Sequence, residues 1–513
     1  MDNTLTDVKI GENQIKKALA TLNDYKSCKS NLDNRIIANN EWYRMRIQKE
    51  YTKSDGTKVI SDDTQSSAWL FNSIANKHAD AMDNMPEPNV LPREQSDAET
   101  AQILSEILPV ALERNDFNKV YSKAWYQKLK EGTACYGVFW DSDKLNGVGD
   151  ITIRNINVLN IFFESGIDDI QDSANVFHVE LFDNDYLSAV YPQLNGKLGA
   201  GNVTINTYVY DDTVDTKNKT AVIDWYYKVK NGAKIVLHYC KFCNGICLFA
   251  SENDPQYADG FYTHGQYPFV FDSLFDNEGT PCGFGYIDVM KGAQREIDIL
   301  EDSIIKNAQT SAKQRFFVSA NGNVNEQEFA NTENTFIHVQ NSNLGNDSIR
   351  PLETPTLATI YRQVLVDKID ELKETSGNRD FSQGGTSSGV TAASAIAALQ
   401  EAGSKLSRDM IKGSYRSYTK ICYLCIELMR QFYDAPRTFR IVYPNGDINY
   451  QQFTNKSLKP QMQGTDFGTD LGYRLPIFDI EVKTQKSSPY AKQTQNELAL
   501  QFYSAGFFSP NNA

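Results

Sequence analysis

Cysteines are the residues whose spacing most suggests a chemical site, here a metal site. Cys240 and Cys243 form a Cys-x-x-Cys pair, and Cys247 follows after an Asn-Gly turn. Structural zinc takes four sulfur or nitrogen ligands, and a Cys-x-x-Cys pair around a turn supplies two of them. In a predicted hairpin the same thiols pack as small hydrophobic groups. Packing is the favoured interpretation, and whether Cys240, Cys243 and Cys247 bind metal stays open.

A second Cys-x-x-Cys pair, Cys422 and Cys425, does not complete such a site. It lies in a long helical pattern, where a spacing of three places both thiols on one apolar face. We therefore predict neither a metal nor a cofactor for this chain.

The loop 384–389, Gly-Gly-Thr-Ser-Ser-Gly, precedes a predicted helix. Backbone N–H groups at such a turn can hold an anion. The loop is not a nucleotide-binding P-loop, because Val390 follows the last glycine where that motif requires lysine. Two interpretations remain: a flexible connector between helices, or a loop that touches a polyanion passing nearby.

No grouping of residues typical of catalysis is present in the sequence. No His-x-x-x-His or Ser/His/Asp pattern occurs, which argues against acid–base catalysis by histidine. Acidic pairs such as Asp168-Asp169 and Asp211-Asp212 lie in loop-like stretches and are typical of solvated turns. The five histidines are scattered: His78, His178, His238, His264 and His338.

Length and composition indicate a multidomain globular protein. The chain has 513 residues and 57.9 kDa, enough for three or four average domains. Its net charge of -14 argues against a protein that grips nucleic acid by counterion release. Met1–Lys16 lacks the apolar run of a signal peptide, no apolar stretch is long enough to span a membrane, and eight cysteines suit a reduced cytosolic protein.

Hydrophobic periodicity divides the first half of the chain into helices followed by strands. Apolar residues at spacings of three and four predict helices over about 10–22, 67–82, 97–111 and 117–131, with Ser96 as an N-cap and an extended, proline-rich link at 86–92. Alternation and Asn-Gly turns then predict strands at 134–141, 150–154, 159–164, 175–182, 221–230, 233–239 and 246–250.

The helical period returns after residue 285. Met290, Ile297, Leu300 and Ile304 form a narrow, heptad-like apolar seam, which favours packing against a neighbouring helix. The remaining pattern predicts strands at 315–319 and 335–340 in an insert closed by prolines, a helix over about 357–376, a long helix at 391–434, strands at 438–443 and 477–484, and a last helix from about 489. The fold class is α+β.

This order of elements resembles the portal protein of tailed double-stranded DNA bacteriophages, the head–tail connector. The resemblance rests on a Gly283-Phe-Gly285 lead-in to a helix with Gln294 and Asp298, an α/β insert, a returning helix and a Gly/Ser-rich loop. It also includes a long helix that opens with Gly389–Ile396. Further stretches resemble portals from phages of Gram-positive hosts, namely Asn40–Arg44, Ser67–Ile74 and Leu129–Cys135.

The resemblance implies the portal fold in a dodecameric ring at one capsid vertex, with DNA passing along its axis. The expected ranges are wing 1–285, stem helix 286–314, α/β clip 315–356, stem helix 357–376, tunnel loop 377–390, wing long helix and strands 391–488, and start of the crown 489–513. The last range is short for a crown, and whether the crown is truncated stays open.

The resemblance also implies function and partners. The protein would be non-enzymatic: a large terminase subunit docks on the clip and packages the DNA, which is later ejected, and head-completion, adaptor and tail proteins bind afterwards. Major capsid and scaffolding proteins would be further partners, and no membrane is involved. The expected location is the portal vertex of the virion, with assembly in the host cytoplasm.

Two sets of residues follow as candidate sites. We expect the seam to pack partly against the adjoining subunit through Met290, Ile297, Leu300 and Ile304. We expect the tunnel loop to contact DNA through Arg379, Gly384, Gly385, Thr386, Ser387 and Ser388.

Two other functions remain as alternatives. One is another ring-forming virion protein, such as a neck or minor capsid component. The other, less favoured, is an enzyme with a structural zinc, which should show a convergent polar cluster in its sequence. The acidic composition suits a channel, because like charge keeps DNA sliding instead of binding it.

Overall fold

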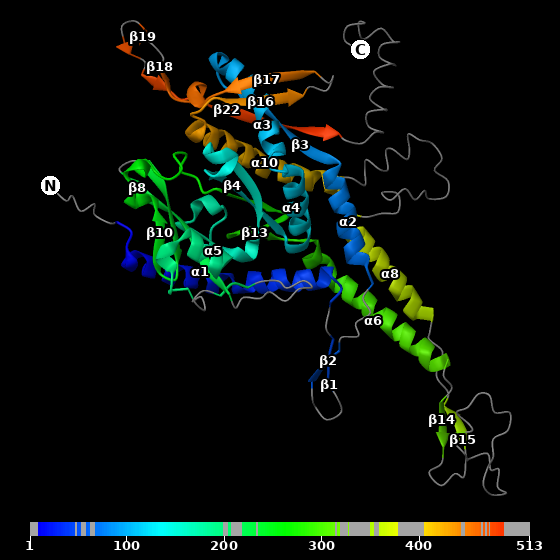
Figure 1. Ribbon diagram of the computed structural model, residues 1–513. Helices are drawn as coiled ribbons and strands as arrows, with labels where there is room; N and C mark the ends of the chain where they lie inside the picture. The colour runs from blue at the N-terminus through cyan, green and yellow to red at the C-terminus, as the bar shows by residue number, and fades with distance from the viewer. Residues whose placement is uncertain are drawn as a thin grey trace, which may run out of the picture. The chain divides into compact units, whose positions relative to one another are not determined.

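The computed structural model describes residues 9–46, 49–52, 58–61, 67–198, 204–206, 218–231, 234–312, 315–318, 327, 349–352, 359–377, 405–442, 447–462, 465–466, 469–470 and 472–486. The chain divides into two compact units (Figure 1). Unit 1 takes residues 1–46, 70–289 and 377–513, and unit 2 takes residues 47–69 and 290–376. Helices combine with small antiparallel sheets, which confirms the α+β class.

Unit 1 contains a long first helix that the sequence predicts only in part. The helix α1 runs over Glu12–Tyr43, well past the expected end near residue 22. Beyond Leu22 its buried side includes Lys29 and Asp33, which form an ion pair of 2.8 Å. Polar residues on the buried side conceal the apolar period, and this is why the expected helix was too short.

Two further helices show where local signals succeed and fail. The helix α4, Phe117–Glu131, ends as predicted at Gly132, whose φ of +90° and contact with the Phe284 backbone admit no side chain. The helix α3, Ala98–Glu113, does not begin at Ser96, so that prediction is wrong. Ser96 lies in a short 3-10 turn before α3. Asp97, the residue directly before the helix, binds Arg474 through its carboxylate.

A five-stranded antiparallel sheet forms the larger core of unit 1. Its order is β10 (Ile246–Ala250), β9 (Lys234–Cys243), β8 (Lys219–Asn231), β7 (Asn175–Asp183) and β6 (Ile161–Phe163). The helix α1 lies along one face, where Ile15 and Leu22 pack with Phe177, Ile223 and Phe242 (Figure 1). The other face carries a smaller cluster with Leu187 of α5, Asn184–Val190.

A second sheet lies under the helix α10, Lys405–Phe432. Its order is β11 (Phe269–Ser273), β4 (Thr133–Asp141) and β5 (Asp150–Ile156), and it contains the hairpin predicted from residues 134–154. The proline-rich link is extended as predicted and pairs as β3, Asn84–Pro92, with β22, Phe478–Lys486. Prolines are tolerated there because each strand of a two-stranded sheet has a free edge.

A buried ion pair joins α4, β11 and α10. Lys128 Nζ lies 2.7 Å from an Asp272 carboxylate oxygen, and the two side chains are 1% and 3% exposed. Ser414 and Ser417 of α10 donate hydrogen bonds to the same carboxylate, at 2.8 and 3.2 Å. Every polar group of this cluster is satisfied, as a buried charge requires.

Replacing Asp272 by Ala should destabilise unit 1 strongly. Lys128 would remain buried without its counter-charge, which costs about 3–5 kcal/mol. Urea unfolding followed by tryptophan fluorescence measures the loss. The matched control is Arg93→Ala, which breaks the exposed Arg93–Asp479 pair of 2.7 Å and should change the stability little, because water screens an exposed ion pair. Equal losses in the two variants would contradict this account.

The described part of unit 1 also contains smaller elements. The helix α2 spans Trp69–Met82, with Trp69 itself counted in unit 2. The remaining strands pair as β12 (Phe275–Asn277) with β13 (Thr280–Phe284), β16 (Arg437–Val442) with β17 (Ile448–Phe453), β18 (Gln461–Met462) with β21 (Tyr473–Arg474), and β19 (Thr465–Asp466) with β20 (Thr469–Asp470). The sequence did not predict β17 to β21.

The described residues of unit 2 include two long helices and two hairpins. The helix α6 spans Tyr286–Ala312, of which residues from 290 onward belong to unit 2, and α8 spans Thr359–Ser376. The hairpins are β1 (Lys49–Thr52) with β2 (Lys58–Ser61), and β14 (Arg315–Val318) with β15 (Ile349–Leu352). Two prolines, Pro351 and Pro355, were expected to close the insert; Pro351 lies inside β15, and Pro355 lies outside the described residues.

Several predicted elements lie outside the described residues. They are the strand at 335–340, the start of the long helix at 391–404, the last helix from 489, and all of the loop 377–390 except Gly377.

Candidate interaction surfaces and a pocket in unit 1

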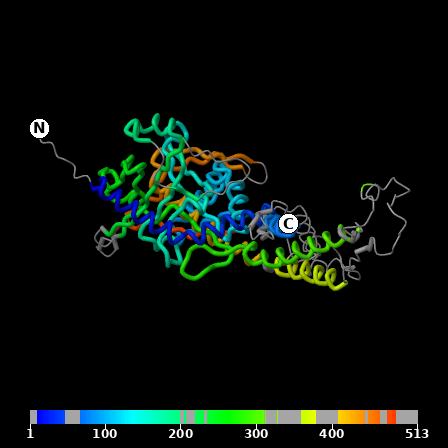
Figure 2. Tube along the Cα trace, turned by 90° about the horizontal axis from the view of Figure 1, so that it is seen from below, coloured from blue at the N-terminus to red at the C-terminus, as the bar shows by residue number. Residues whose placement is uncertain are grey.

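The helices α6 and α8 of unit 2 lie side by side (Figures 1 and 2). Lys368 of α8 forms ion pairs of 2.8 Å with Glu296 of α6 and with Glu371 on its own helix. The two carboxylates hold the pKa of Lys368 above its usual value. Because the Lys368 side chain is still 31% exposed, water screens these ion pairs, and they set the register of the helices more than their stability.

A polar network ties the segment before α2 to α6. Asp298, only 6% exposed, accepts hydrogen bonds from the Ser67 backbone N–H at 3.0 Å and from its hydroxyl at 3.1 Å. Gln294 donates to the same carboxylate at 2.8 Å and to the Ser67 carbonyl oxygen at 3.0 Å. Gln294, Asp298 and Ser67 are among the residues on which the resemblance to portal proteins rests. The network gives all three a structural role.

The predicted seam lies largely inside the chain. Met290 and Ile297 are 1% and 0% exposed, while Leu300 and Ile304 are half-buried. The first two side chains are therefore covered without any neighbouring subunit. Large apolar side chains do stand exposed elsewhere on these helices: Ile299 and Ile305 on α6, and Ile360, Tyr361, Val364 and Val366 on α8. These exposed apolar side chains are available for contact with a partner.

The predicted DNA-channel residues Arg379, Gly384, Gly385, Thr386, Ser387 and Ser388 lie outside the described residues. Within the expected clip, 315–356, the structure describes β14, β15 and residue 327. The contact of the loop with DNA and the role of the clip therefore stay predictions.

The cysteines of the possible zinc site do not converge. Cys240 packs in the cluster under α1, whereas Cys243 packs on the opposite face of the same sheet. A Cys-x-x-Cys pair divided between two faces cannot chelate one ion. Cys422 and Cys425 are buried in α10, and within the described ranges no three metal-binding side chains gather.

The described histidines have individual structural partners. His178 comes closest to a catalytic arrangement, 3.6 Å from both Glu180 and Asp224. Tyr239 donates a 2.6 Å hydrogen bond to Asp224, and Lys241 lies 3.6 Å from it, so this carboxylate is fully occupied. His264 is held neutral, because burial and then Arg430 lower its pKa to about 4.

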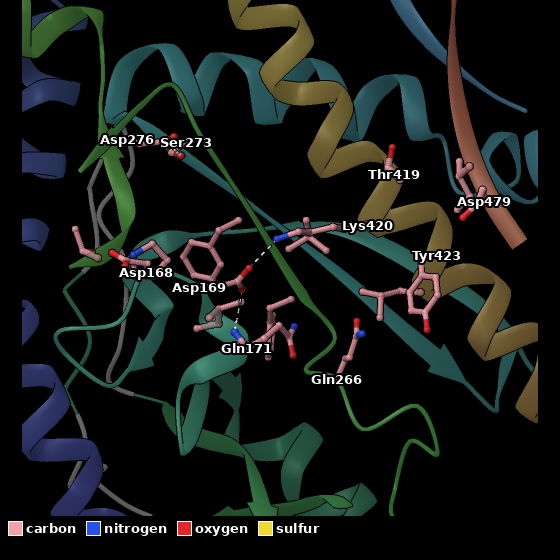
Figure 3. Close-up of a pocket in the computed structure, with 18 of the residues that line it drawn as sticks. Asp168, Asp169, Gln171, Gln266, Ser273, Asp276, Thr419, Lys420, Tyr423 and Asp479 are labelled. Carbon is pink, nitrogen blue, oxygen red and sulfur yellow. Dashed lines mark hydrogen bonds and ion pairs between the residues drawn. The ribbon is translucent and has the colours of Figure 1, made fainter. Parts of the chain in front are cut away.

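Unit 1 also contains a pocket of about 980 Å³ between β11, α10 and the start of β22 (Figure 3). Lys420 of α10 reaches across to Asp169, with a contact of 2.8 Å. Burial alone would raise the pKa of Asp169, but hydrogen bonds from Lys420 and the Gln171 N–H keep it below its usual value. This ion pair joins residues 251 positions apart, and the sequence offers no signal for it.

The acidic side chains of the pocket serve as structural acceptors. Asp168 accepts a 2.7 Å hydrogen bond from the Gly279 N–H, and Asp276 is bonded to the Ser273 hydroxyl. The pair Asp168-Asp169 lies in a bend open to solvent, as expected, and it is not a two-carboxylate site, since each carboxylate binds a different element. In Figure 3, Asp168 and Asp169 lie next to each other, Asp276 lies beside the Ser273 hydroxyl, and Asp479 lies apart from them on the other side of the pocket.

Comparisons with known proteins place the chain in a family. A family model described as Phage P22-like portal protein matches residues 79–512, which is most of the chain. No curated protein matches it. Among the helices that the structure describes, none combines the length and apolarity needed to cross a membrane. The extent of the family match decides the assignment: the chain belongs to the phage P22-like portal protein family.

Proposed function

We propose that this protein assembles into a dodecameric ring at one capsid vertex, through which terminase packages double-stranded DNA and from which the DNA is later ejected. The family match over residues 79–512 carries the proposal, since portal proteins are structural components of the phage capsid. The protein itself would hydrolyse nothing, and assembly would take place in the host cytoplasm.

The exposed faces of α6 and α8 support the ring. Ile360 is 64% exposed, and Tyr361, Val364 and Val366 are between 38% and 45% exposed on the same helix. Burying such side chains against a neighbouring subunit gains roughly 25 cal/mol for each Å² of apolar surface. We assign the subunit interface to these faces, together with the half-buried Leu300 and Ile304 of the seam.

Negative-stain images and native mass spectrometry of the purified chain test the ring. Twelve-fold rings with a central hole support the proposal, and a ring of another size would correct only the stoichiometry. A monomer at all concentrations would contradict the ring.

The clip, 315–356, is the proposed docking surface for the large terminase subunit and, after packaging, for head-completion and adaptor proteins. The paired strands β14 and β15 support this assignment, because they hold the two ends of the insert together between α6 and α8. Major capsid and scaffolding proteins would contact the wing.

The tunnel loop, 377–390, is the proposed contact with DNA. It contains one cation, Arg379, and one anion, Asp380, so it is nearly neutral in a chain of net charge -14. Hydroxyl and N–H groups can touch phosphates without holding them, since a neutral hydrogen bond contributes only about 1 kcal/mol.

Replacing Thr386, Ser387 and Ser388 by Lys should slow DNA translocation. The variant places a basic ring around the DNA, and the slowing should weaken as salt rises, because phosphate binding releases counterions. Single-molecule packaging rates measure both effects, and replacement of the same residues by Gln controls for side-chain size. An unchanged rate at low salt would mean that the loop does not meet the DNA.

A further inference from the structure

The hairpin of β9 and β10 brings two cysteines together at an edge of the five-stranded sheet. Cys240 is cross-strand partner of Ala250, and Cys247 is cross-strand partner of Phe242. Cross-strand partners share a face, and so do residues two apart in a strand. Cys240 and Cys247 therefore lie on one face, and both pack in the cluster under α1.

A β-bulge keeps this alignment. The register shifts between Cys247 and Phe249, so that Cys247 and Ala250 face the same way although they are three positions apart. The turn between the strands, Asn244-Gly245, has positive φ at both residues, as a tight two-residue hairpin turn requires. The strand register therefore makes the two cysteines diagonal neighbours on one face of the hairpin.

The thiols differ in exposure and in acidity. Cys240 is fully buried, whereas Cys247 is half-buried on the edge strand β10. The hydrogen bond from Cys240, together with one from the Phe249 backbone, lowers the pKa of Cys247 to about 7 although burial opposes it. The same hydrogen bond, and burial, raise the pKa of Cys240, which keeps its proton.

We propose that Cys240 and Cys247 form a reversible dithiol–disulfide site, with Cys247 as the thiol that hydrogen peroxide attacks and Cys240 as the resolving thiol. This site is independent of the portal function. Cys243, although closer to Cys247 in sequence, cannot replace Cys240, because it points to the opposite face of the sheet.

The chemistry balances with one peroxide for each chain. The Cys247 thiolate sulfur attacks one peroxide oxygen, the O–O bond breaks, and the departing hydroxide takes up a proton as water, which leaves a sulfenic acid. The Cys240 sulfur then attacks the Cys247 sulfur, the S–O bond breaks, and hydroxide leaves with the Cys240 proton as a second water. Two thiols are oxidised to one disulfide as one peroxide is reduced to two waters.

Peptide mass spectrometry of the full chain tests the proposal. Cys28 is exposed and is first replaced by Ser, so that chains do not crosslink. After stoichiometric hydrogen peroxide and alkylation, we expect a Cys240–Cys247 crosslink that dithiothreitol reverses, and no crosslink in Cys247→Ser. In Cys240→Ser, Cys247 should remain a sulfenic acid that dimedone traps.

The matched control is Cys243→Ser, in the same hairpin, which should form the crosslink as the parent does. A Cys243–Cys247 crosslink, or oxidation of Cys247 to sulfinic acid while Cys240 stays alkylatable after unfolding, would overturn the assignment. The parent chain alone decides between these outcomes, so a Cys240→Ser variant that fails to fold does not weaken the test.

Discussion

Replacing Ile360 and Val364 of α8 by Asp should leave the chain folded and abolish ring formation. Both side chains are exposed in the single chain, at 64% and 38%, so a carboxylate there meets water before assembly. In a ring, each carboxylate would be buried against the neighbouring subunit, which costs about 2 kcal/mol or more for an unpaired polar group. The cost recurs at every interface, and native mass spectrometry should show monomers.

The matched control is the double variant Thr359→Asp and Gln363→Asp. It places two carboxylates at the same spacing on polar, exposed positions of the same helix, and it should form rings. Circular dichroism must show both variants folded. Rings at normal yield from the Ile360/Val364 variant would remove the subunit interface from α8.

Ile360 and Val364 were chosen because their exposure is known only from the structure. A heptad-like seam predicts that α6 packs against a helix, but not whether that helix belongs to the same chain. Ile297, with no exposed surface, is covered within its own chain. An Ile297→Asp variant would unfold part of the subunit, so the loss of rings would say little about the interface.

The sequence predicted correctly those turns and helix ends that depend on the type of only one or two residues. The Asn244-Gly245 turn placed the hairpin of β9 with β10, and Gly132 marked the end of α4; all three residues have a positive φ. Such signals succeed because a positive φ restricts the residue type directly.

Contacts between distant residues were not predictable. The pairs Lys128–Asp272 and Lys420–Asp169 join segments that the sequence gives no reason to bring together. Buried polar residues such as Lys29 and Asp33 hid the second half of α1, because an apolar period assumes an apolar core. The faces of Cys240 and Cys243 likewise needed the register of β9 with its neighbours.

Deleting Gly322–Thr332 from the clip should leave the ring intact and abolish DNA packaging. The deletion lies between β14 and β15, whose register runs from Arg315 with Leu352 to Val318 with Ile349. Those pairs remain, so α6 and α8 stay connected through an antiparallel hairpin and the interface on α8 is untouched. If the insert carries about 3 kcal/mol of terminase docking, its loss weakens binding roughly a hundredfold.

The measurement is the yield of DNA-filled heads in a packaging assay, beside negative-stain images of the deleted ring. A second variant keeps the same residues in shuffled order, which separates the length of the insert from its sequence. If the shuffled insert also fails, specific side chains of the clip recognise the terminase; if it packages normally, the insert acts as a spacer. Normal packaging by the deletion itself would place the docking surface outside residues 322–332.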